Sequence, residues 1–99
     1  MVKHMVLWSF REELSQDERE AAAAKIKEGL EALVGVVPGL LSAVVVTEPI
    51  PSSTHDLCLI TELDTPESLK AYATNPDHVK VAAFVRSVTC NRAAMDFVE

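Results

Sequence analysis

Cysteine, glycine, aromatic residues and long apolar runs are all scarce in this 99-residue chain. It has two cysteines, three glycines and 5% aromatic residues. Cys58 and Cys90 belong to no CxxC motif or Cys/His cluster, so we expect reduced thiols that pack as small apolar groups. No apolar run approaches the roughly 20 residues of a membrane span, and the N-terminus lacks a signal-peptide pattern. These absences predict a cytoplasmic protein that does not enter a membrane.

Basic charge is scarce as well. Nine lysines and arginines stand against 15 aspartates and glutamates, for a net charge of -6, and the basic residues form no stripe. The average field repels phosphate, so nucleic acid is not an expected partner. The chain has no glycine-rich phosphate loop and no GxSxG nucleophile motif. His4, His55 and His78 lie in distant segments without the short spacing of a metal site, so we expect neither a metal nor a cofactor.

The residues that are present predict one globular domain over residues 1–99. Hydrophobic residues make up 48% of the chain and charged residues 24%, which suits a packed core. Apolar, β-branched stretches predict strands at residues 2–10, 40–47, 56–63 and 90–98. In the first strand Val6 and Trp8 point to one face, while Met5 and Leu7 point to the other. Because both faces are apolar, we expect both to be covered.

The first helix is delimited by capping residues. Ser15 and Glu18 have the spacing of a capping box, which predicts a helix start. The helical period continues to about residue 34, and Gly35 is the expected C-terminal cap. Lys27 and Glu31 fall on the solvent side of this helix.

A helix break organises the second half of the chain. Thr65-Pro66 predicts a helix start, and Asn75-Pro76 repeats the same device, so a new helix begins near Asp77. The break lies between Tyr72, the chain's only tyrosine, and His78. Two helical segments joined in this way can turn both side chains towards one point.

This order of elements predicts an α+β fold. The β-α-β-β-α-β sequence is the ferredoxin-like motif, a four-stranded antiparallel sheet with helices on one face. Its usual strand order places the first strand between the third and fourth. Cys58 and Cys90 would then lie roughly 9–10 Å apart, too far for a disulfide. Since the helices cover only one face, the simplest cover for the other is a second copy, giving a homodimer through the helix-free sheet face.

An ordered set of short segments along the whole chain resembles the stress-responsive A/B barrel family, also called the Dabb or dimeric α+β barrel family. The segments are Val2-Lys3-His4-Met5-Val6-Leu7, Val37-Pro38-Gly39-Leu40, His55-Asp56-Leu57-Cys58-Leu59, Leu69-Lys70-Ala71-Tyr72, Asn75-Pro76-Asp77-His78, Phe84-Val85-Arg86 and Met95-Asp96-Phe97. The resemblance implies a ferredoxin-like subunit whose sheet packs face to face with that of a partner. It does not imply one activity, because family members include a plant polyketide cyclase, plant stress proteins that form larger assemblies, and many bacterial proteins without an assigned reaction.

The resemblance also implies a candidate site. In the cyclase a histidine and a tyrosine act as an acid/base pair in a pocket between sheet and helices, and the matching residues here are His78 and Tyr72. A histidine of the first strand lines that pocket and matches His4.

The chain departs from the cyclase at several pocket positions. Trp8 lies on the face of His4 and narrows the expected cavity. Leu57 replaces a histidine of the third strand, and Thr89 and Arg92 stand where the cyclase has bulky residues. We therefore do not transfer the cyclase's specificity to this chain.

The residue chemistry alone supports the same candidates. An imidazole exchanges protons near neutrality, so His78 can act as a general base, and the phenol of Tyr72 can donate to a carbonyl or enolate oxygen. We expect a pocket lined by His4, Val6, Trp8, Val81 and Val85. The alternative is that His78 satisfies backbone groups at the helix start and Tyr72 is packing.

Three functions remain open at this stage. The first is a dimeric binding or stress-related protein with a small apolar pocket for a carbonyl or aromatic compound. The second is a cofactor-free cyclase, isomerase or lyase that acts on a polyketide-like substrate through His78 and Tyr72. The third is an assembly protein whose pocket is incidental. A cavity that reaches His78 is required by the first two and not by the third.

Overall fold

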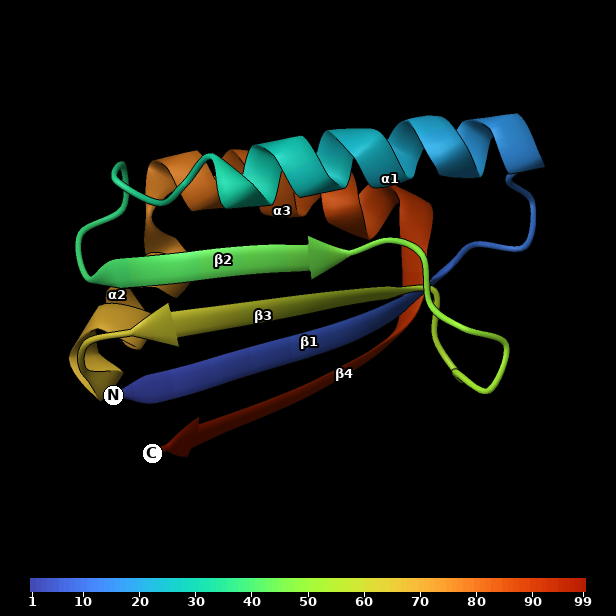
Figure 1. The fold of residues 1–99 in the computed structure, drawn as a ribbon. Helices are drawn as coiled ribbons and strands as arrows, with labels where there is room; N and C mark the ends of the chain where they lie inside the picture. Colours follow the sequence, from blue (N-terminus) through green and yellow to red (C-terminus); the bar gives the residue numbers. More distant parts are fainter.

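A computed structural model describes residues 1–99 and shows a four-stranded sheet with three helices on one face (Figure 1). The elements are β1 (Val2–Phe10), α1 (Gln16–Glu31), β2 (Leu40–Val46), β3 (Leu57–Leu63), α2 (Pro66–Thr74), α3 (Pro76–Val88) and β4 (Thr89–Val98). The strands pair antiparallel in the order β2-β3-β1-β4. The predicted ferredoxin-like β-α-β-β-α-β fold is confirmed, with α2 and α3 together in the place of the second helix.

The three helix starts follow the capping residues. The Ser15 hydroxyl accepts from the amide of Glu18, and the Glu18 carboxylate accepts from the amide of Ser15. The Thr65 hydroxyl accepts from the first turn of α2. Asn75, at φ -62° and ψ 130°, ends α2 and caps α3 by accepting from the amide of Asp77. This extended residue, fixed by the following proline, turns the chain between the two helices.

The predicted end of the first helix is wrong. The helix ends at Glu31, and the chain then tightens into turns in which Leu33 and Val37 are buried. Gly35 has a φ of +87° and belongs to these turns, so it is not the cap of α1. Burial of two apolar side chains in the turns replaces the last helical turn that the periodicity predicts.

The helical period predicts that Lys27 and Glu31 face solvent. In the structure both side chains instead bond to the backbone of β2. The Lys27 ammonium donates to the carbonyl oxygen of Val45 at 2.8 Å, and Glu31 accepts from the Val45 amide at 2.8 Å. These two side chains also pair with each other at 2.8 Å. Because β2 is an edge strand, they satisfy backbone groups that no neighbouring strand can reach.

The core fills the space between the helices and the sheet. Its most buried large side chains are Val6, Ile26, Val45, Leu57, Leu63 and Tyr72. The opposite face of the sheet is apolar but uncovered in the single chain. On that face Leu7, Val44, Val46, Met95 and Phe97 keep 36%, 50%, 38%, 68% and 41% of their surface exposed.

None of the helices is long and apolar enough to cross a bilayer. Cys58 and Cys90 are both free thiols, on β3 and β4, which are separated by β1.

Candidate ligand and acid/base site

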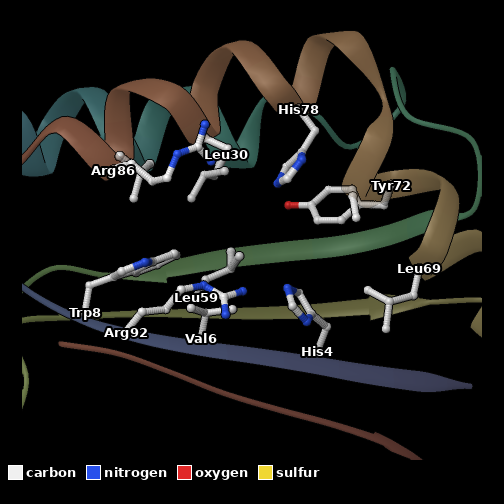
Figure 2. Close-up of a pocket in the computed structure, with 13 residues that line it drawn as sticks. His4, Val6, Trp8, Leu30, Leu59, Leu69, Tyr72, His78, Arg86 and Arg92 are labelled. Carbon is white, nitrogen blue, oxygen red and sulfur yellow. The ribbon is translucent and has the colours of Figure 1, made fainter. Parts of the chain in front are cut away.

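A cavity of about 180 Å³ lies between the sheet and the α2–α3 pair (Figure 2). Its sheet wall is formed by His4, Val6 and Trp8 of β1 with Leu59 of β3, and Arg92 of β4 lies at its border. Its helix wall comes from α2 and α3, with Leu30 of α1 behind them. Most of the lining is apolar, so the few polar atoms that reach the cavity determine its chemistry.

Tyr72 and His78 form the polar end of the cavity. The break at Asn75 brings their ring centroids to 4.1 Å, with 40° between the planes. Tyr72 is 1% exposed. Neither its hydroxyl group nor Nδ1 of His78 has a hydrogen-bond partner, although both atoms are buried. An unsatisfied buried polar group costs about 1–3 kcal/mol, so two of them side by side require an explanation.

Burial favours the neutral form of both groups. It raises the pKa of Tyr72 to about 12. Burial also lowers the pKa of His78 below its usual 6.5, and the positive fields of His4, Arg86 and Arg92 act in the same direction, while the backbone of Ala73 partly opposes them. A neutral imidazole is a proton acceptor, and a neutral phenol is a hydrogen-bond donor. The pair therefore has the protonation states of a base and an oxyanion stabiliser.

His4 lies across the cavity from this pair. Its ring is 6.0 Å from that of Tyr72, centroid to centroid, in an edge-on arrangement at 69°. Asp96, directly opposite His4 on β4, accepts a hydrogen bond from Nδ1 of His4. That bond fixes the ring and leaves the second ring nitrogen, Nε2, on the cavity side (Figure 2).

Two arginines also border the cavity. The sequence analysis placed Arg92 at a pocket position only as a departure from the cyclase, and it gave Arg86 no place in the site. Arg86 comes from α3 and Arg92 from β4, on opposite walls (Figure 2). Arg92 follows a β-bulge, because Asn91, at φ 52°, is an extra residue in the pairing of β4 with β1. A bulge re-aims the adjacent side chains, and the surrounding alternation puts Arg92 on the helix side with Asp96.

The structure brings together most of the residues expected in the pocket. His4, Val6, Trp8, Tyr72, His78 and Val85 all line the cavity, and Trp8 does not fill it. Val81 is the exception, because its side chain lies against Gly29 of α1, with Val81 Cγ1 3.0 Å from where a β-carbon of residue 29 would lie.

Two further positions raised by the sequence lie elsewhere. His55 bonds to the hydroxyl of Thr54 and the carbonyl oxygen of Asn91, outside this cavity. Leu57, which stands where the cyclase has a histidine, is 2% exposed and belongs to the core. No group of three or more His, Cys, Asp or Glu side chains is arranged to hold a metal ion.

The β-α-β-β-α-β order with its antiparallel sheet places the chain among the ferredoxin-like α+β proteins. The sequence profile of the stress responsive A/B barrel domain matches residues 2–99. The chain therefore belongs to the stress-responsive A/B barrel (Dabb) family.

Solved structures agree with this assignment. A dimeric protein of unknown function with a ferredoxin-like fold from Bacteroides fragilis is 28% identical, with a TM-score of 0.92 over 99% of this chain and 95% of that one. A dimeric ferredoxin-like protein of unknown function from Thermobifida fusca is 19% identical, with a TM-score of 0.80 over 99% and 90%. A Dabb family protein from Mesorhizobium loti is 19% identical, with a TM-score of 0.72 over 99% and 95%. The latter two support the fold alone. No curated protein matches the chain.

Proposed function

We propose that this Dabb protein works as a homodimer and binds a small aromatic or carbonyl compound in the cavity of each subunit. The observation that carries the proposal is the buried, unpartnered hydroxyl of Tyr72, which lies beside the unpartnered Nδ1 of His78. A carbonyl oxygen in the cavity would accept from the phenol and remove the cost of the missing hydrogen bond. We also propose that the protein acts in the cytoplasm, where free thiols such as those of Cys58 and Cys90 stay reduced.

The size of the cavity limits the ligand. An apolar cavity of about 150 Å³ holds a benzene molecule, and the present cavity measures about 180 Å³. Pockets for drug-sized ligands are larger, about 300–1,000 Å³. The proposed ligand is therefore a single ring with a short substituent, or a carbonyl compound of that size, and an extended polyketide chain would not fit without opening of the cavity.

The apolar, helix-free sheet face supports the homodimer. Half-exposed apolar side chains of β1, β2 and β4 lie together on it, and an uncovered apolar face of this extent is typical of an interaction surface. Several structural relatives are described as dimeric. A partner sheet packed there would leave the cavity, on the helix side, within a single subunit.

Calorimetric titration with acetophenone tests the binding proposal. Acetophenone is a single ring with one carbonyl group, and we expect one molecule to bind per subunit. Tyr72→Phe removes the donor but keeps the ring, so affinity should fall roughly two- to tenfold, the value of one neutral hydrogen bond.

Two alanines of α3 supply a matched pair of control variants. Ala82 lines the cavity, whereas its neighbour Ala83 is exposed. Ala82→Leu should fill the cavity and reduce acetophenone affinity by more than about tenfold, and Ala83→Leu should leave it unchanged. Equal binding by all of these variants would show that the ligand does not occupy this cavity.

The protonation states favour a second candidate function, acid/base catalysis without a cofactor. A neutral His78 is suited to remove a proton from the carbon next to a carbonyl, while the Tyr72 phenol donates to the oxygen as enolate charge develops. The proton would pass from the substrate carbon to an imidazole nitrogen. Its return to another carbon of a conjugated enolate would complete an isomerisation. In an aldol closure the enolate carbon would instead attack a second carbonyl of the substrate, and the imidazolium would give its proton to the new alkoxide oxygen. This candidate needs the same cavity and adds a chemical step.

A further inference from the structure

The cavity has two chemically different ends. Tyr72 and His78 form an inner, neutral end, and Tyr72 is almost fully buried. Arg86 and Arg92 form an outer end, because both are exposed residues that nevertheless line the cavity. A ligand that spans the cavity meets a phenol at one end and two guanidinium groups at the other (Figure 2).

Neither guanidinium group has a partner within the chain. The ion pairs of the protein involve Lys3, His4 and Lys27, and no side-chain hydrogen bond from Arg86 or Arg92 is present. Seven of the nine lysines and arginines form no ion pair, and Arg86 and Arg92 are the two of these that line the cavity. Asp96, the carboxylate opposite His4 on the neighbouring strand, is already bonded to that histidine.

Two arginines on opposite walls of one apolar cavity have the chemistry of a carboxylate clamp. A guanidinium group presents paired N–H donors that match the two oxygens of a carboxylate. The arginines also add to the positive field at His78. An anionic group between them would neutralise that field and satisfy donors that no protein group reaches.

We propose that the ligand of this cavity is a small keto or aryl carboxylate, with its carboxylate held between Arg86 and Arg92 and its carbonyl oxygen at Tyr72. This inference rests on the proposed function, since it assigns the charge of the ligand in the same cavity. It would give both guanidinium groups at the cavity border an anionic partner.

A pair of isosteric ligands separates the charge from the rest of the molecule. 3-Acetylbenzoate and 3-acetylbenzamide share the ring and the ketone and differ in the carboxylate. We expect the wild-type protein to bind the carboxylate about tenfold more tightly than the amide, the effect of charge-assisted hydrogen bonds. Calorimetry gives the ratio of the carboxylate affinity to the amide affinity in each variant. A substitution that alters the cavity in general changes both affinities alike and leaves this ratio unchanged.

The variants are Arg86→Gln, Arg92→Gln and their combination, with Lys80→Gln as control. Lys80 is an exposed cation on α3 that does not line the cavity. The ratio should fall towards one in the double variant and stay near its wild-type value in Lys80→Gln. A wild-type ratio near one, or a ratio unchanged in the double variant, would overturn the carboxylate assignment while leaving the proposed function intact. Failure of both ligands to bind a wild-type protein that does bind acetophenone would overturn the carboxylate assignment alone, and failure of acetophenone as well would overturn the proposed function too.

Discussion

Val44→Lys should convert the proposed dimer into a monomer at micromolar protein concentration. Val44 is 50% exposed in the single chain and lies on the helix-free face, which the proposed partner covers. Two-fold symmetry would place one lysine from each subunit in the interface, and an unpaired buried charge costs several kcal/mol. A loss of only about 3 kcal/mol per dimer weakens association by more than about 100-fold.

Val79→Lys is the matched control for this substitution. Val79 is also a valine and is 43% exposed, but it lies on α3, on the opposite side of the molecule. Sedimentation equilibrium over a range of protein concentrations should give a monomer for Val44→Lys and a dimer for Val79→Lys. The reverse result would move the interface to the helix side and contradict the face-to-face arrangement of sheets.

His78→Gln should abolish catalysed exchange of the methyl protons of acetophenone in deuterated water. If the second candidate function is correct, the wild-type protein accelerates this exchange, because a neutral His78 removes the proton and Tyr72 stabilises the enolate oxygen. Loss of a general base costs roughly 100- to 10,000-fold, and loss of an oxyanion donor in Tyr72→Phe costs about 100-fold or more. Proton NMR of the methyl group measures the rate directly.

The pH dependence of this exchange has a defined direction. Because the pKa of His78 lies below 6.5, its imidazole is neutral at pH 7 and the rate should stay level through neutrality. The rate should fall only as pH drops through the lowered pKa, when the base becomes protonated. His55→Gln is the control, because His55 lies outside the cavity and should not alter the rate. Exchange that survives in His78→Gln would limit the protein to binding.

The fold could be predicted from the sequence because its helix starts are specified by residues close together in the chain. The capping box at Ser15, the Thr65-Pro66 start and the Asn75-Pro76 break each specify a helix terminus through neighbouring atoms. The order of the elements predicted the ferredoxin-like strand order, and the structure confirms that the first strand lies between the third and fourth. The end of α1 was missed because Leu33 continues the helical period, although its burial occurs in a turn.

The site was accessible only in part, because its remaining features depend on tertiary contacts. Periodicity alone could not separate Val81 from Ala82, and the close packing of α3 on Gly29 of α1 decides which of them reaches the cavity. Alternation along β4 puts Arg92 on the face of Asp96, but it does not show that this position borders the cavity, which depends on the pairing of β4 with β1. A helical projection likewise cannot show that Lys27 reaches the backbone of an edge strand.

In the proposed function the buried hydroxyl of Tyr72 is the hydrogen-bond donor to the ligand. Tyr72 is the only tyrosine of the chain, so protein labelled with ¹³C at the tyrosine Cζ gives a single NMR resonance. We expect this resonance to titrate at about pH 12 in the free protein, and at neutral pH to shift saturably as acetophenone is added. A resonance that titrates near pH 10, or that does not move at saturating acetophenone, would contradict this role of the buried Tyr72 hydroxyl.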